Sequence, residues 1–97
     1  MRIFIYGTLL DNKVLAKALH GHPVQEHHAK LTGYEKVEKN GYPNLVAKPG
    51  ASVEGKTFQV VGRDVELLDT WEEKYHRRMV ILDDGKAAQV YVLKKEE

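Results

Sequence analysis

The residue best suited to acid or base chemistry is a glutamate on the apolar side of a predicted helix. We expect that helix to begin at Asp64, as its N-cap, and to run to about Lys74. At about 100° per residue, Glu72 lies at about 340°, whereas Asp69 and Glu73 lie at about 40° and 80° and face water. The apolar arc extends from about 200° to 360° and contains Val65, Leu67, Leu68, Trp71 and Tyr75.

A carboxylate at that position loses hydration, so its pKa rises toward the range that is useful for proton transfer. The residues alone leave other roles open. Glu72 can form an ion pair with Lys74, Arg77 or Arg78, or occupy an edge position that still sees solvent. Tyr75 can simply extend the apolar stripe, and Arg77 can be an exposed charge at the start of a strand.

A second candidate site follows the first predicted strand. The β-branched and aromatic run that starts at Arg2 is typical of a buried strand. Gly7 then lets the chain turn, and the apolar run resumes after Thr8. Amides in such a turn have no ladder partner and can hold an anion or a developing oxyanion. The alternative is a strand that only turns toward the next element.

Four histidines lie close together in a predicted loop region: His20, His22, His27 and His28. Imidazoles at this density can hold zinc, copper or nickel. However, no carboxylate or thiol completes a familiar metal-ligand spacing, and a polar surface loop also accounts for them. We therefore expect neither a metal site nor a cofactor.

The elements that position these residues alternate between strands and helices. Gly21 ends a short helix, which Asp11 or Asn12 caps and which carries Val14, Leu15, Ala18 and Leu19 on one face. We expect further strands over 29–37, with a kink or bulge at 32–34, and over 42–46, 53–61, 79–82 and 87–93. Predicted turns separate them at Asn40-Gly41, Pro49-Gly50 and Asp83-Asp84-Gly85. Gly55 indicates a bulge or a close backbone approach within its strand. This order predicts one α+β domain over 1–97, a small mixed β-barrel flanked by two helices.

Composition excludes several classes of function. The chain has 97 residues, no cysteine and a formal net charge of +1, so we expect neither thiol chemistry nor electrostatic attraction to nucleic acid or membranes. We see no signal peptide and expect a cytoplasmic protein. We also expect it to be a monomer or a small homo-oligomer.

Several short motifs, taken in order, resemble the γ-glutamylcyclotransferase-like family, with its AIG2-like and γ-glutamylamine cyclotransferase branches. The most specific is Leu68-Asp69-Thr70-Trp71-Glu72 followed by Tyr75-His76-Arg77, which resembles L-D-x-x-E with a following Y-x-R. In many members a glycine follows that glutamate, whereas this chain has Glu73. The other matching segments are Tyr6-Gly7-Thr8-Leu9, Ala29 with Gly33, Gly41-Tyr42-Pro43-Asn44-Leu45-Val46, Val53-Glu54-Gly55 and Ala88-Gln89-Val90-Tyr91.

The resemblance implies a cofactor-free enzyme that converts a γ-glutamyl amine or γ-glutamyl amino acid into 5-oxoproline and a free amine. It implies that Glu72 is the acid/base residue and that Tyr6, Gly7, Thr8 and Leu9 hold the γ-glutamyl group, largely through backbone amides. Candidates for lining the pocket are Tyr42, Tyr75 and Tyr91, and Arg77 would hold either Glu72 or the substrate carboxylate. The alternative is a non-catalytic domain of the same fold that binds a carboxylate or acylated metabolite.

Overall fold

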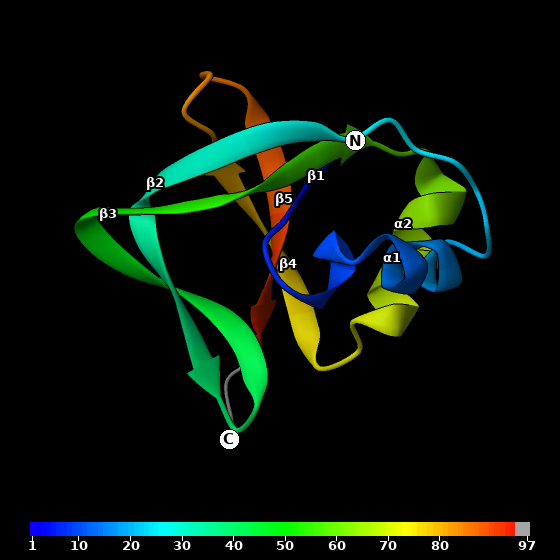
Figure 1. Ribbon diagram of the computed structural model, residues 1–97, viewed down its shortest axis with the longest axis horizontal. Coiled ribbons are helices and arrows are strands. Elements are labelled where there is room, and N and C mark those ends of the chain that lie inside the picture. The colour runs from blue at the N-terminus through cyan, green and yellow to red at the C-terminus, as the bar shows by residue number, and fades with distance from the viewer. Residues whose placement is uncertain (95–97) are drawn as a thin grey trace.

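Strand β1 (Arg2–Ile5) lies in the middle of a five-stranded sheet with the order β2-β3-β1-β5-β4 (Figure 1). It pairs antiparallel with β3 and parallel with β5 in a computed structural model that describes residues 1–94. Mixed pairing and two helices confirm the predicted α+β class. The remaining elements are η1 (Thr8–Leu10), α1 (Asn12–Ala18), β2 (His27–Lys39), β3 (Tyr42–Gln59), α2 (Gly62–Trp71), β4 (Tyr75–Ile81) and β5 (Ala87–Leu93).

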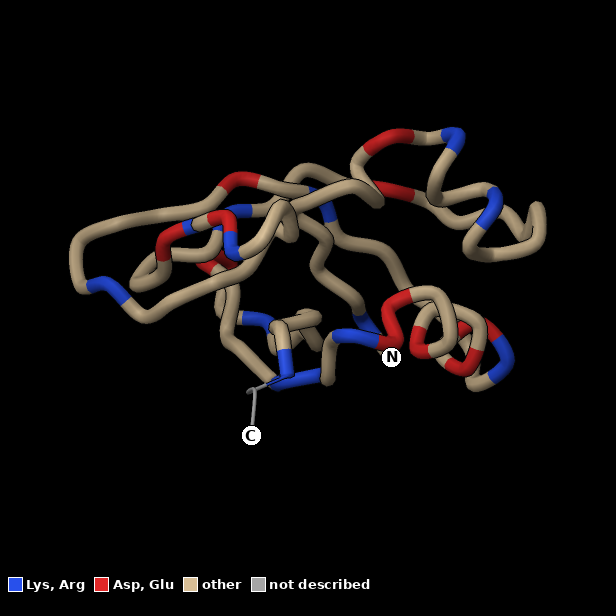
Figure 2. Tube along the Cα trace, turned by 90° about the horizontal axis from the view of Figure 1, so that it is seen from below, with Lys and Arg blue, Asp and Glu red and all other residues tan. Residues whose placement is uncertain are grey.

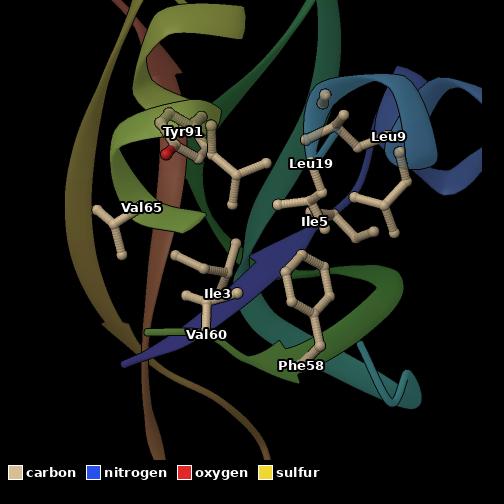
Figure 3. Packing of buried hydrophobic residues seen from close by; sticks show 11 residues of the cluster. Ile3, Ile5, Leu9, Leu19, Phe58, Val60, Val65 and Tyr91 are labelled. Carbon is tan, nitrogen blue, oxygen red and sulfur yellow. The ribbon is translucent and has the colours of Figure 1, made fainter. Parts of the chain in front are cut away.

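The hydrophobic core has two parts because side chains alternate across the sheet. From β1, Ile3 and Ile5 pack toward α1 and α2, while Phe4 faces the concave side of the sheet together with Tyr6 just beyond the strand. Figure 3 shows the helix-side part, where these isoleucines meet side chains from β3, β5 and both helices. Both faces of β1 are therefore covered, which agrees with the predicted buried strand.

Strands β2 and β3 form one long hairpin. Its turn has positive φ angles at Asn40 (53°) and Gly41 (81°), which confirms the predicted Asn-Gly turn. The register shifts between Thr32 and Tyr34, as the predicted bulge required. The predicted turn at 49–50 is wrong. Residues 48–51 are the additional residues on the β3 side of this bulge, and β3 continues through them. The two strands expected over 42–46 and 53–61 are therefore one strand.

The turn after β4 is hydrogen-bonded to β2 and so connects the two edges of the curled sheet. Asp83 donates its amide to the carbonyl oxygen of Lys30 in β2 at 2.9 Å. Its carboxylate accepts from the amide of Thr32 at 2.9 Å and from the Thr32 hydroxyl at 2.8 Å. Within residues 1–94 no strand pairing joins β2 to β4, so the sheet is curled like a barrel but remains open.

Gly55 confirms the predicted close approach of two backbones. A Cβ atom at this position would lie 2.1 Å from the carbonyl oxygen of Ile5 and 2.9 Å from Cζ of Phe4. Any larger residue would therefore push β3 away from β1. The glycine keeps the strands close beside the end of β1, where the chain turns into η1.

The helix boundaries differ in part from the prediction. Asp11 caps α1 as expected, since its side chain accepts from the amide of Lys13 at 2.8 Å. Val61, not Asp64, is the N-cap of α2, and the helix ends at Trp71 rather than at Lys74. The side chain of Asp64 is buried and bonded to His22 from the α1–β2 loop, so it is not available as a cap.

No helix within residues 1–94 combines the length and apolar character that crossing a bilayer requires. Figure 2 shows lysine and arginine as well as aspartate and glutamate distributed over the molecule. The surface thus carries both signs of charge on its strands and its helices.

Candidate active site

A pocket opens where the end of β1, the end of α2 and the β2–β3 hairpin meet. Its inner part, here called the inner pocket, is narrow, with a cavity volume of about 20 Å³. A wider outer groove of about 300 Å³ adjoins it, and the two share Thr8, Pro43, Glu72 and Tyr75. The inner pocket is lined by Phe4, Ile5, Tyr6, Gly7, Thr8, Leu9, Pro43, Glu72, Tyr75 and Tyr91.

The structure brings most of the predicted site residues together. Tyr6, Gly7, Thr8, Leu9, Glu72, Tyr75 and Tyr91 line the inner pocket, although they come from distant parts of the chain. Tyr42 lines the outer groove. Arg77 lines neither cavity.

Residues 6–9 form one wall, and a short helical turn shapes it. The amide of Leu10 bonds to the carbonyl oxygen of Gly7 at 3.0 Å, which starts the 3₁₀ turn η1. The first amides of any helical turn lack an internal acceptor, so those of Thr8 and Leu9 have no acceptor within η1. A Cβ at Gly7 would lie 2.8 Å from Cγ of Pro43 on the opposite wall, so this wall stays close to the hairpin.

Glu72 occupies the C-cap of α2 at the junction of the inner pocket and the outer groove. Its amide bonds to the carbonyl oxygen of Leu68 at 2.8 Å, and its own carbonyl oxygen accepts from the amide of Tyr75 at 2.9 Å. The residue is half-buried, and burial raises the pKa of its carboxyl group. Among the described residues no ion pair includes Glu72, so the alternative partners Lys74, Arg77 and Arg78 do not hold it.

Three tyrosines, Tyr6, Tyr75 and Tyr91, lie around this carboxylate, and each donates its hydroxyl proton to another group of the protein. Tyr6 donates to the carbonyl oxygen of Tyr91, and Tyr75 donates to that of Pro43 at 2.8 Å. Burial and the nearby Glu72 carboxylate raise the pKa of Tyr75 to about 12, and burial raises that of Tyr6 further. These side chains are therefore neutral near pH 7, and their oxygens can act only as acceptors toward a ligand.

Asp69 is the site-adjacent residue that the sequence analysis missed. Its side chain is 42% exposed, in agreement with its predicted position on the solvent side, but its Oδ1 also accepts from the Tyr91 hydroxyl at 2.7 Å and from Nε of Arg77 at 2.9 Å. Arg77 thus holds Asp69, which is neither of its two expected partners. Helical periodicity places Asp69 just outside the apolar arc. The sequence feature that points to Asp69 is its spacing of three residues from Glu72 in the L-D-x-x-E motif, which puts the two residues on neighbouring positions of the helix.

The outer groove carries the exposed charges beside the site. Nζ of Lys74 lies 2.6 Å from Oη of Tyr42 and 4.4 Å from the centre of its ring. This hydrogen bond raises the pKa of Lys74 and keeps it a cation. Trp71, expected on the apolar side of the helix, is the last residue of α2, lines the outer groove and is 45% exposed. Glu73 is exposed as expected.

The clustered histidines do not converge on one point. Nδ1 of His22 lies 3.1 Å from Oδ1 of Asp64, and His20, His27 and His28 are exposed. Within residues 1–94 no group of three or more histidine, aspartate or glutamate side chains is arranged to hold a metal ion.

Comparison with known families agrees with the fold. Residues 3–97 match the family model described as Gamma-glutamyl cyclotransferase, AIG2-like, and the chain belongs to that family. No curated protein matches the chain.

Solved structures with the same fold include proteins of known and unknown activity. Two proteins of Arabidopsis thaliana, both known as solution structures, are 26% and 27% identical to this chain, with TM-scores of 0.78 and 0.79. Each alignment covers 95% of this chain, but 67% and 61% of the plant proteins, so the chain spans about two thirds of their length. The solved structure of a gamma-glutamyl cyclotransferase is 16% identical to this chain, with a TM-score of 0.75. The alignment covers 100% of this chain and 68% of that protein, and at this identity it supports the fold alone.

Proposed function

We propose that this protein is a γ-glutamylcyclotransferase that releases 5-oxoproline and a free amine from a γ-glutamyl amine or γ-glutamyl amino acid. The observation that carries the proposal is the position of Glu72. Among residues 1–94 this half-buried carboxylate forms no ion pair, and it lines a pocket whose other wall is formed by residues 6–9. Family membership supports the general kind of reaction.

Glu72 would begin the reaction as a base. The α-amine of the substrate is protonated at neutral pH, so a proton must leave before the nitrogen can attack. Burial raises the pKa of Glu72, which makes it a stronger base than an exposed carboxylate. The α-nitrogen then bonds to the γ-carbonyl carbon and closes a five-membered ring.

The same carboxylate would complete the reaction as an acid. When the bond between the γ-carbon and the leaving nitrogen breaks, that nitrogen needs a proton, and protonated Glu72 can supply it. Over the whole reaction the α-nitrogen loses two protons and the leaving nitrogen gains two, so Glu72 can carry each in turn. No water or external nucleophile is consumed.

The developing oxyanion would be stabilised by backbone amides rather than by tyrosine. The hydroxyl protons of Tyr6, Tyr75 and Tyr91 are already donated to protein acceptors. The amides of Thr8 and Leu9 at the start of η1, with the Thr8 hydroxyl, would supply the donors from the wall formed by residues 6–9. Tyr75 and Pro43 would confine the glutamyl chain in a folded, reactive conformer.

Incubation of the protein with a panel of γ-glutamyl amines and γ-glutamyl amino acids tests this proposal. We expect stoichiometric release of 5-oxoproline and free amine from at least one class. Calorimetric binding of the panel without turnover would favour the non-catalytic binding domain instead. Neither binding nor turnover across the panel would reject both functions.

A further inference from the structure

Asp69 ties three elements together beside Glu72. It lies three residues before Glu72 in α2, and its Oδ1 accepts two hydrogen bonds, from Tyr91 at 2.7 Å and from Arg77 at 2.9 Å. The two donors come from adjacent strands, because Arg77 of β4 pairs directly with Tyr91 of β5. One carboxylate oxygen therefore fixes the last turn of α2 to both strands of the β4–β5 hairpin.

This junction leaves the backbone of Glu72 little freedom. On one side, its amide bonds to Leu68 within the last turn that Asp69 holds. On the other, its carbonyl oxygen accepts from Tyr75, the first residue of β4. Glu72 is thus fixed from both directions by groups attached to the same hairpin.

The junction also reaches the opposite wall of the inner pocket. The carbonyl oxygen of Tyr91 accepts from the hydroxyl of Tyr6, which precedes Gly7. Tyr91 is buried, so its hydroxyl needs a partner, and Asp69 supplies it. A single residue of β5 therefore connects Asp69 to the wall formed by residues 6–9.

We propose that Asp69 is a positioning residue that sets the orientation of the Glu72 carboxylate in the inner pocket. The inference rests on the proposed function for its kinetic consequence. Its structural consequence, the environment of the Glu72 carboxylate, can be measured without turnover.

The charges near Glu72 predict the direction in which each substitution shifts the pKa of Glu72. The ionisable groups around Glu72 lie on five parts of the chain: Tyr6 beyond β1, Tyr42 from β3, Asp69 from α2 with Glu73 and Lys74 after it, Tyr75 and Arg77 from β4, and Tyr91 from β5. Tyr6, Tyr75 and Tyr91 are neutral near pH 7. The charged groups are therefore Asp69 and Arg77, which form an ion pair and offset one another, and Glu73 and Lys74 on the outer groove, which the substitutions below leave unchanged. Removing the negative charge of Asp69 leaves Arg77 uncompensated and lowers the pKa of Glu72. Removing the positive charge of Arg77 leaves Asp69 uncompensated and raises that pKa.

The test compares Asp69→Asn and Arg77→Gln with Glu66→Gln, a matched control that neutralises an exposed carboxylate on α2. Carbon-13 NMR titration follows the Glu72 carboxyl resonance, identified by its loss in Glu72→Gln. We expect the Glu72 pKa to fall in Asp69→Asn, to rise in Arg77→Gln and to stay unchanged in the control. In Asp69→Asn we also expect kcat to fall between about 10- and 100-fold with KM little changed.

A lower melting temperature in Asp69→Asn with an unchanged Glu72 pKa and unchanged kcat would overturn the inference and leave Asp69 a structural residue. If Asp69→Asn does not fold, the titration of Arg77→Gln decides, since an unchanged Glu72 pKa there also contradicts the proposed coupling. If the wild-type protein releases no 5-oxoproline, the proposed function fails, and the NMR titration still tests the positioning of Glu72.

Discussion

Replacing Gly7 with alanine adds a methyl group between the two walls of the inner pocket. The new Cβ would lie 2.8 Å from Cγ and 3.3 Å from Cβ of Pro43. Non-bonded carbon atoms pack at about 3.5–4.0 Å, so the closer contact is too short by roughly 0.7 Å or more. The proline ring cannot rotate away, and its carbonyl oxygen is held by the hydroxyl of Tyr75 at 2.8 Å. Either residues 6–9 or the hairpin must therefore move.

We expect the free energy of unfolding to fall by about 1–3 kcal/mol in Gly7→Ala, the usual cost of overpacking. Release of 5-oxoproline should fall up to about 100-fold, because displacement near 1 Å at a reacting centre has that effect. Urea denaturation followed by circular dichroism gives the first quantity, and product release gives the second.

Gly62→Ala is the matched control, since a Cβ at Gly62 meets no atom within 4 Å. It should leave turnover unchanged and alter the free energy of unfolding by less than about 1 kcal/mol, in the stabilising direction. Adding Pro43→Ala to Gly7→Ala should recover part of the lost stability, because it removes the Cγ atom in the closest contact. If Gly7→Ala matches Gly62→Ala in both measurements, the close approach of the two walls is refuted.

Three further predictions concern the frame of the site. Gly55→Ala should lower the free energy of unfolding by at least about 3 kcal/mol in urea denaturation, because its Cβ would lie 2.1 Å from the carbonyl oxygen of Ile5; a loss below about 1 kcal/mol would contradict this. Asp83→Ala should lower the free energy of unfolding by about 1 kcal/mol and speed hydrogen exchange at the Thr32 amide, because it removes two hydrogen bonds between β2 and the β4–β5 turn. Unchanged exchange at that amide would contradict the role of these hydrogen bonds. Glu72→Gln should stabilise the fold at pH 7, because burial raises the pKa of Glu72 above 4.5 and the folded state therefore binds its proton more tightly than the unfolded state. That gain should disappear below about pH 4, where Glu72 is protonated in both states, and a gain that persists there would have another cause.

Local patterns predicted the parts of the fold that depend on neighbouring residues. Alternating apolar residues indicated the buried strand at β1, and Asn40-Gly41 indicated the hairpin turn through its two positive φ angles. The angular position of Glu72 predicted its half-buried environment, even though α2 ends one residue earlier. Glu72 directly follows the last helical residue, so helical periodicity still gives the approximate direction of its side chain.

The errors arose where a distant contact outweighed the local signal. Pro49 and Gly50 together indicate a turn, but pairing of β2 with β3 on both sides carries the strand through them as a bulge. Asp64 is a residue type that often caps helices, but its side chain is buried in a contact with His22, which lies 42 positions away in the sequence. Asp69 is a polar residue beside the apolar arc, and only the packing of β4 and β5 against α2 reveals its role.

The most direct measurement of the central claim is the kcat for 5-oxoproline release by Glu72→Gln beside Glu73→Gln. Both variants remove one carboxylate charge at adjacent positions, but only Glu72 lines the inner pocket. We expect Glu72→Gln to lower kcat by about 10²- to 10⁴-fold, the usual contribution of a general acid/base, and Glu73→Gln to stay within about twofold of the wild type. Wild-type kcat in Glu72→Gln would contradict the assignment of Glu72 as the acid/base residue.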